Sequence, residues 1–252
     1  MQKAAELVHK GKTLRGMVHR PDANETSFPA VVLFHGFTGS KGEDKFLFVR
    51  IARALCEEGI GCVRFDFSGS GESDGRFADM TFSGEMSEAQ AILNFTRQLE
   101  WTDNERIGVL GFSMGAAVAA QITKDRAADV AKLCLLSPAG NMPDKAKLYF
   151  ETCTFLPNGH ADLGGLELGR AFVEDLADRD LYDGVERYEN PVLILHGAKD
   201  EAVPEHVGRN YADLYKNAAF VAVDEADHSF SSAVWRNELV QRVSAFFGGR
   251  QP

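Results

Sequence analysis

The chain has 252 residues, of which 44% are hydrophobic and 25% charged, and its formal net charge at pH 7 is −10. This length and composition are typical of one α/β domain with a full core, and no change in composition marks a second domain. The acidic balance argues against nucleic acid or an anionic membrane as a partner, since both need a basic surface. We therefore expect a single domain over residues 1–252, with no nucleic-acid partner and no stable membrane association.

Cysteine usage and apolar runs bear on the compartment. Residues 1–9 have no apolar stretch of signal-peptide length, and no run reaches the ~18 to 20 residues of a membrane span. The cysteines have no Cys-x-x-Cys spacing and three lie in apolar stretches, which favours reduced core thiols. They are Cys56, Cys62, Cys134 and Cys153. We expect a cytoplasmic protein, either a monomer or a homodimer.

The amino-terminal third predicts a hairpin and two buried strands. Residues 4–10 and 13–19 alternate polar and apolar side chains around Gly11-Lys12, which predicts an antiparallel hairpin. The apolar runs 28–35 and 60–66 are typical of strands buried on both faces. Apolar residues at helical spacing predict two helices, 44–58 and 84–100.

Strands and helices continue to alternate to the end of the chain. This alternation predicts a mostly parallel sheet of eight strands with helices on both faces, in which only the amino-terminal pair is antiparallel. The further strands begin at Arg106 and span 130–136, 192–196 and 219–223, and the further helices reach about Asp125 and span 204–216 and 232–247.

The rhythm stops between about residues 139 and 189, after the sixth predicted strand. This stretch holds Pro143, Pro157-Asn-Gly159 and Gly164-Gly165, with a short helical piece at 166–177. Insertions of this length inside a compact domain are usually functional. We therefore expect a lid or cap rather than a tolerated surface loop.

A strand enters a helix through Gly111-Phe-Ser-Met-Gly115, the Gly-x-Ser-x-Gly pattern of a nucleophile elbow. Side chains at Gly111 and Gly115 would collide with the neighbouring strand and helix. The turn strains the serine backbone and places Ser113 Oγ at a helix N-terminus, where developing negative charge is favoured. The pattern predicts Ser113 as a nucleophile.

A serine nucleophile needs a base that a carboxylate orients, and in chains with this elbow the order is Ser, Asp or Glu, His. Asp200 follows the seventh predicted strand, and His228 is the only histidine after the eighth. We therefore predict Ser113, Asp200 and His228 as a catalytic triad. Asp227 is interpreted as a helix cap beside His228.

The oxyanion of a tetrahedral intermediate needs two backbone N–H donors. Met114, directly after the nucleophile, supplies one, and Phe37 in the loop after the third strand is predicted to supply the other. The glycine-rich loop 68–75 lacks Gly-Lys-Ser/Thr and carries two acidic residues, which indicates a structural turn rather than a phosphate site. No His-Glu-x-x-His or Cys/His cluster is present, so we expect no metal and no cofactor.

Taken together, these motifs make the chain resemble the α/β hydrolase superfamily over nearly its whole length. They are the His35-Gly-Phe turn, Asp66-Phe-Ser-Gly-Ser-Gly-Glu-Ser73, Gly111-Phe-Ser-Met-Gly115, His196-Gly-x-x-Asp200 with Val203-Pro204, and Asp227-His228-Ser-Phe. The resemblance implies the α/β-hydrolase fold, with eight strands and a lid after strand six.

Within that superfamily, the chain looks most like the cinnamoyl/feruloyl esterases. The similarity lies in His35-Gly-Phe-Thr-Gly-Ser-Lys41, the place of the insertion, and Ala226-Asp-His-Ser-Phe230. The resemblance implies cleavage of hydroxycinnamate esters, with lid residues that hold the phenolic hydroxyls. The candidate substrate-binding residues are His35, Asp144, Tyr149, His160 and Tyr182.

The resulting hypothesis is a serine hydrolase of carboxylic esters that works through an acyl-enzyme. The same machinery serves thioesterases, acylglycerol lipases and small-peptide aminopeptidases, so these alternatives remain open. A dehalogenase is disfavoured because it would need a carboxylate at Ser113. A ligand-binding receptor or scaffold on the same fold is disfavoured because such proteins often lose a triad member, whereas this chain keeps all three.

Overall fold

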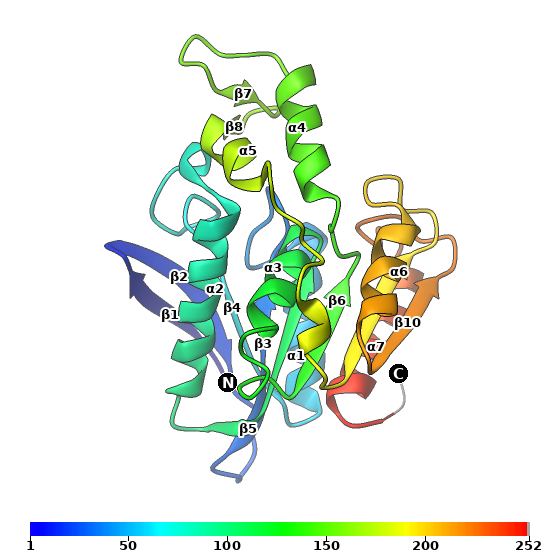
Figure 1. Cartoon of the computed structure of the whole chain (residues 1–252). Coiled ribbons are helices and arrows are strands. Elements are labelled where there is room, and N and C mark those ends of the chain that lie inside the picture. Colours follow the sequence, from blue (N-terminus) through cyan, green and yellow to red (C-terminus); the bar gives the residue numbers. More distant parts are fainter. Residues whose placement is uncertain (251–252) are drawn as a thin grey trace.

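A computed structural model describes residues 1–250 and contains an eight-stranded sheet (Figure 1). The pairs from β4 to β10 are all parallel, and β2 is antiparallel to both of its neighbours. The predicted mostly parallel sheet of eight strands is therefore confirmed, with a second antiparallel ladder between β2 and β4 that the sequence did not predict. In sheet order the strands are β1 (Gln2–His9), β2 (Lys12–His19), β4 (Gly61–Phe65), β3 (Phe28–Phe34), β5 (Thr102–Phe112), β6 (Lys132–Leu136), β9 (Val192–Gly197) and β10 (Ala218–Val223).

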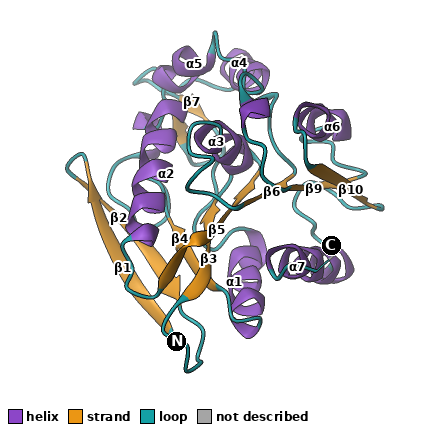
Figure 2. Ribbon diagram, turned by 60° about the horizontal axis from the view of Figure 1, so that its bottom comes forward, coloured by secondary structure: helices purple, strands orange, loops and turns teal. Residues whose placement is uncertain are grey.

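Helices cover both faces of this sheet (Figure 2). One face carries α1 (Leu47–Glu57) and α7 (Ala233–Phe247), and the other carries α2 (Phe82–Arg97), α3 (Met114–Thr123) and α6 (Glu205–Leu214). Two separate clusters of buried apolar side chains fill these faces. The interior strands β4 and β9 are buried along their whole length, as the apolar runs predict.

The helix predicted over 44–58 begins later than expected. Lys45 and Phe46 have φ angles of 45° and 64°, so the chain makes a short 3₁₀ turn at Asp44–Phe46 before α1 starts. Helix α2 begins two residues earlier than expected because Thr81 caps it, its hydroxyl accepting a hydrogen bond from Gly84 N–H at 3.0 Å.

The chain between β6 and β9 lies over the carboxyl ends of the strands (Figure 1). The helix predicted over 166–177 begins later than expected. Glu167 and Leu168 pair with the strand Ala161–Asp162, and the helix begins only after Gly169. The insertion holds α4 (Met142–Thr152), β7 (Ala161–Asp162), β8 (Glu167–Leu168), α5 (Arg170–Leu176) and a 3₁₀ turn, η3 (Val185–Arg187).

Polar contacts dock this insertion on the start of α2. Asp175 accepts hydrogen bonds from the backbone N–H of Ser83 at 2.7 Å and from its hydroxyl at 2.5 Å, and pairs with Arg179 at 3.0 Å. Although burial alone would raise the pKa of Asp175, these partners lower it overall. The carboxylate thus occupies the positive end of the α2 dipole. Within residues 1–250, no helix combines the length and apolarity that a membrane crossing requires.

Candidate active site

Ser113 lies in a strained turn between β5 and α3. Its backbone has φ 53° and ψ −119°, outside the regions that residues with a Cβ prefer. A Cβ at Gly111 would lie 2.2 Å from Gly115 O, and one at Gly115 would lie 2.2 Å from Phe34 O. Both glycines are therefore required by close backbone approach, as the pattern predicts.

The structure brings the three predicted triad residues into one hydrogen-bonded chain. Ser113 Oγ lies 3.0 Å from His228 Nε2, and His228 Nδ1 lies 2.7 Å from Asp200 Oδ2. The Asp200 carboxylate only accepts, so Nδ1 carries the proton and Nε2 is left to accept from the serine hydroxyl. This arrangement lets the imidazole take a proton from Ser113.

The Asp200 carboxylate is buried and held by several donors. Val203 N–H donates to Oδ1 at 2.7 Å, and His196 Nε2 lies 3.4 Å from Oδ2. Burial alone would raise the pKa of Asp200, but hydrogen bonds from His196, His228 and Val203 hold it well below its usual value. The carboxylate therefore stays ionised beside the imidazole across the physiological range.

The loops that carry Asp200 and His228 are fastened to each other. Lys199 N–H donates to Ala226 O at 2.9 Å. A Cβ at Gly197 would lie 2.5 Å from the same Ala226 oxygen, so the two loops pack in direct contact. The carboxylate of Asp227 accepts from Ser231 N–H at 2.9 Å and folds the turn after His228. The helix cap expected at Asp227 is wrong, because Ser232 is the N-cap of α7.

Sequence reasoning missed Arg236, a buried side chain of α7 that supports this site. Its guanidinium donates to Phe230 O at 2.7 Å and to Ser229 O at 3.1 Å, in the loop of His228. It also pairs with Asp44 Oδ2 at 2.7 Å, near the loop after β3. An isolated arginine on a helix has no sequence signature, so no local signal could have found it.

The loop after β3 passes directly beside Ser113. A Cβ at Gly36 would lie 3.1 Å from Ser113 Cβ, so the peptide that leads to Phe37 lies against the elbow. Among residues 1–250, several N–H groups of this loop donate within the protein, and that of Phe37 is not among them. The donors are Gly36, Gly39, Lys41, Gly42 and Glu43. Met114 is the first residue of α3, where an N–H has no partner within its own helix.

His35 does not fit the expected substrate-binding role. The side chain is buried, its Nδ1 lies 2.9 Å from Gly36 O, and its Nε2 accepts from Phe67 N–H at 3.0 Å. Both ring nitrogens are therefore engaged with backbone. His35 ties the loop after β3 to the loop after β4, and no nitrogen remains for a ligand.

A cavity of about 570 Å³ opens at Ser113 and His228. Its walls come mainly from the loop after β3, and Phe112 and Ser229 also line it. Polar groups dominate this lining, and they are Thr38, Ser40, Glu43, Asp44 and Ser229. The cavity therefore suits a group that can form hydrogen bonds.

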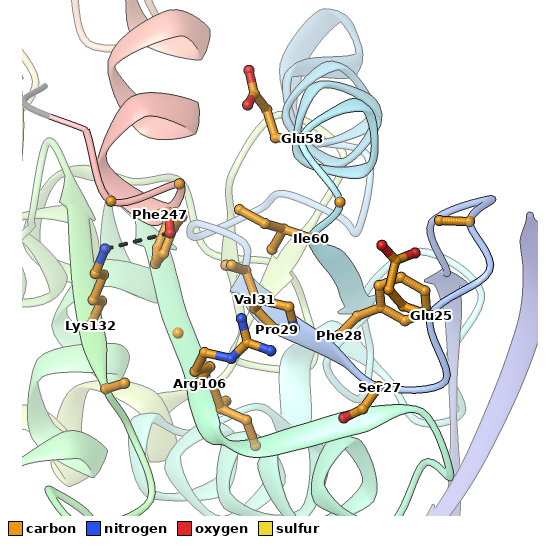
Figure 3. A pocket seen from close by; sticks show the side chains of 17 residues that line it. Glu25, Ser27, Phe28, Pro29, Val31, Glu58, Ile60, Arg106, Lys132 and Phe247 are labelled. Atoms are coloured by element: carbon orange, nitrogen blue, oxygen red, sulfur yellow. Dashed lines mark hydrogen bonds between the residues drawn. The ribbon is translucent and has the colours of Figure 1, made fainter.

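A second hollow of about 550 Å³ lies at the opposite edge of the sheet, around the amino ends of β3, β5 and β6 (Figure 3). Arg106, Lys132 and Phe247 border it. Lys132 Nζ donates to Phe246 O at 2.6 Å, and Arg106 pairs with Asp103 at 2.6 Å. The charged groups of Lys132 and Arg106 therefore already have partners within the protein. The hollow is also remote from Ser113, which follows the other end of β5.

The remaining expected substrate contacts lie in the insertion, and none of them lines the cavity at Ser113. Asp144 is exposed on α4, and His160 Nδ1 lies 2.8 Å from Glu167 Oε2 beside the β7–β8 hairpin. Tyr182 packs on Tyr211, and its hydroxyl donates to Val207 O at 3.3 Å.

Tyr149 instead belongs to an aromatic cluster that joins the insertion to the loop after β3. The Phe37 ring stacks on Tyr149 with centroids 6.0 Å apart and on Phe172 with centroids 5.2 Å apart. Phe77 completes the cluster, 5.5 Å from Phe37. The cluster places α4 and α5 in contact with the residue whose N–H is the predicted oxyanion donor.

The glycine-rich loop 68–75 folds around a buried carboxylate. Asp66 accepts from Glu72 N–H at 2.9 Å and from Lys41 Nζ at 2.6 Å. A Cβ at Gly71 would lie 2.3 Å from Asp66 Oδ2, so the turn closes tightly on this side chain. Across the part of the chain that the structure describes, no group of three His, Cys, Asp or Glu side chains could hold a metal ion.

A strained serine at a strand-to-helix turn, joined to a histidine and an aspartate from the loops after β10 and β9, defines an α/β hydrolase. The chain belongs to the family described as serine aminopeptidase, S33, whose model matches residues 26–161. The fold expected from the resemblance is thereby confirmed.

Solved structures and curated relatives agree with this assignment. Est1E from Butyrivibrio proteoclasticus with ferulic acid bound superimposes with a TM-score of 0.88 and 25% identity, over 98% of each chain. The expected resemblance to the cinnamoyl/feruloyl esterases is thus confirmed. The chain is also similar to a lysophosphatidylserine lipase, ABHD12 of Danio rerio, at 27% identity over 75% of this chain and 48% of that protein.

A palmitoyl-protein thioesterase, human mitochondrial ABHD10, is 25% identical over 80% of this chain and 69% of its own length. An uncharacterized 31.7 kDa protein of Escherichia coli is 24% identical over 81% of this chain, which spans 66% of that relative and about half of ABHD12. The chain therefore belongs to a hydrolase family, and the proteins that it resembles include a lipase and a thioesterase.

Proposed function

We propose that this protein hydrolyses carboxylic esters through an acyl-enzyme on Ser113. The observation that carries the proposal is the hydrogen-bonded chain from Ser113 Oγ through His228 to the buried Asp200 carboxylate. A serine hydroxyl at its ordinary pKa is a weak nucleophile, and this arrangement supplies both the base and the group that orients it.

The proposed reaction has two halves. His228 Nε2 takes the Ser113 proton as Oγ attacks the ester carbonyl, and the oxyanion accepts hydrogen bonds from Phe37 and Met114 N–H. The C–O bond to the alcohol then breaks, and His228 returns the proton to the leaving oxygen. In the second half His228 deprotonates water, which attacks the acyl carbon and releases the carboxylic acid and Ser113. Asp200 keeps the imidazole in its reactive tautomer.

The substrate that we propose is a small aryl ester, such as a hydroxycinnamate, or a short-chain acyl ester. The likeness to Est1E with ferulic acid bound supports an aromatic acyl group. The insertion supports the same choice, because its Tyr149 and Phe172 stack on Phe37 beside the cavity. We propose that the insertion acts as the lid over this aromatic group.

Thioester hydrolysis is the second candidate, and the similarity to ABHD10 favours it. The chemistry needs the same nucleophile, base and oxyanion donors, with a thiolate as the leaving group. A long apolar acyl chain is disfavoured here, since mainly polar groups line the cavity at Ser113. A short-chain acyl thioester is therefore the form to test.

The discriminating experiment compares kcat/KM on methyl ferulate, p-nitrophenyl butyrate and a butyryl thioester. Ser113→Ala serves as the blank, with circular dichroism to verify its fold. We expect Ser113-dependent turnover, with methyl ferulate preferred over butyrate. A preference for the thioester would select the second candidate. Ser113→Ala with wild-type rates, or wild-type protein that a fluorophosphonate does not label at Ser113, would overturn the triad assignment.

A further inference from the structure

Glu43 closes the loop after β3 on itself. Its Oε1 accepts a hydrogen bond from Gly36 N–H at 2.6 Å, and its Oε2 accepts one from Asp44 N–H at 3.2 Å. The Gly36 contact joins residues seven positions apart, where no backbone acceptor takes this N–H. The Glu43 carboxylate therefore takes the place of a backbone acceptor for the N–H of Gly36, the residue directly before Phe37.

The sequence permits this contact only at a conformational cost. A Cβ at Gly39 would lie 2.6 Å from Glu43 Oε1, so a glycine is needed for the carboxylate to pass. Glu43 itself has φ 55°, in the left-handed region that residues with a Cβ avoid. Burial also raises the pKa of the Glu43 carboxyl group to about 7. Strain of this kind collects where surrounding contacts fix a functional geometry.

The anchored peptide lies beside the proposed reacting atoms. Gly36 is in van der Waals range of the elbow, since a Cβ there would lie 3.1 Å from Ser113 Cβ and 3.3 Å from Phe112 O. Glu43 and Ser113 line the same cavity. The charged groups around the carboxylate are Asp44 beside it and Arg236 of α7, which pairs with Asp44, and the titratable His228 lines the same cavity.

We propose that Glu43 is a positioning residue for the oxyanion hole, because its bond to Gly36 N–H fixes the peptide that aims Phe37 N–H at the carbonyl oxygen. This inference rests on the proposed function of Ser113. A donor stabilises an oxyanion only when it already points at the place where the charge develops. Glu43 acts through the peptide and does not touch the reacting atoms.

The test compares Glu43→Ala, Glu43→Asp and Glu43→Gln with Glu57→Ala, an exposed control at the end of α1. Each variant is assayed for kcat and KM on p-nitrophenyl butyrate and for inhibition by phenylboronic acid, which forms a tetrahedral adduct with an activated serine. We expect Ala and Asp to lower kcat about 10- to 100-fold, somewhat less than the loss of a whole oxyanion donor. KM should stay within about twofold, and the boronate should bind more weakly by the same factor as kcat falls.

Glu43→Gln separates positioning from a general structural role. Its amide oxygen can still accept from Gly36 N–H, so we expect kcat within about threefold of wild type. The side chain of the Asp variant is one methylene shorter, so it keeps the carboxyl group but does not reach Gly36 N–H. This variant replaces Glu43→Ala in the test if the Ala variant does not fold. Unchanged kcat in Ala and Asp would overturn the proposal, as would a rise in KM alone, which would make Glu43 a substrate ligand. A failure of the proposed function shows separately, as wild-type protein without Ser113-dependent turnover or fluorophosphonate labelling.

Discussion

Arg236 and Asp44 form an ion pair at 2.7 Å that joins α7 to the turn before α1, across 192 positions of the chain. The guanidinium also donates to the carbonyls of Ser229 and Phe230, in the loop that carries His228. One buried side chain therefore holds together two loops that line the cavity at Ser113.

We predict that Arg236→Ala lowers the free energy of unfolding by about 2–4 kcal/mol, because the buried Phe230 carbonyl and three partly buried carbonyls lose their donor. Urea denaturation measures this change. Arg242→Ala is the matched control on the same helix, where the lost partner is Glu238 one turn away. That pair should contribute only about 0.3–0.5 kcal/mol. Equal losses in the two variants would contradict the clamp.

Asp200→Asn should preserve the fold and lower kcat by about 10³- to 10⁴-fold. The amide can donate to His228 Nδ1, which moves the ring proton to Nε2 and leaves no acceptor for the Ser113 hydroxyl. Steady-state kinetics at saturating p-nitrophenyl butyrate provide the measurement. A loss below about tenfold would mean that another carboxylate orients the ring.

The raised pKa of Glu43 makes stability depend on pH. Burial raises this pKa from 4.5 to about 7, so the folded protein holds the proton more tightly than the unfolded chain. The contribution is fully present below pH 4.5 and is lost as the pH rises towards 7. Glu43→Gln removes this dependence.

We expect the melting temperature of Glu43→Gln, relative to wild type, to rise between pH 5 and pH 8 by on the order of 2–6 °C. Differential scanning calorimetry at both pH values tests this. Glu57→Gln, at an exposed position, should show no such trend. A constant difference between Glu43→Gln and wild type at the two pH values would refute the shift.

Tyr149→Ala removes one stacking partner of Phe37. Such a pair is worth about 0.5–1.5 kcal/mol, so we predict a two- to tenfold drop, roughly, in kcat on methyl ferulate. Leu148→Ala, one residue earlier and 54% exposed, is the control and should turn over normally. Identical kinetics in both variants would show that Phe37 does not depend on Tyr149.

The sheet and the geometry of Ser113, His228 and Asp200 could be predicted because their signals are local. Glycine spacing fixes the elbow, and the histidine and aspartate follow strands whose apolar runs are unmistakable. Helix α4 was missed because Pro143 was interpreted as a loop residue, whereas it occupies the first turn of the helix, where a missing N–H costs nothing.

The residues that hold the site in place could not be predicted from the sequence, for a different reason. Glu43 and Arg236 act on residues that folding brings close, and neither has a spacing that distinguishes it from a surface charge. His35 was misassigned because a histidine beside a predicted oxyanion loop looks available. Its burial and its two backbone partners emerge only from the packing of β3 against β4.

The stacking of Phe37 on both Tyr149 and Phe172 ties substrate choice to reaction rate. In many enzymes a specificity loop can be exchanged while the catalytic parts stay untouched. Here Phe37, whose N–H is the proposed oxyanion donor, also carries the ring against which the insertion packs. Redesign of the insertion for a new acyl group would therefore disturb turnover on every substrate, unless the replacement restores a flat ring above Phe37.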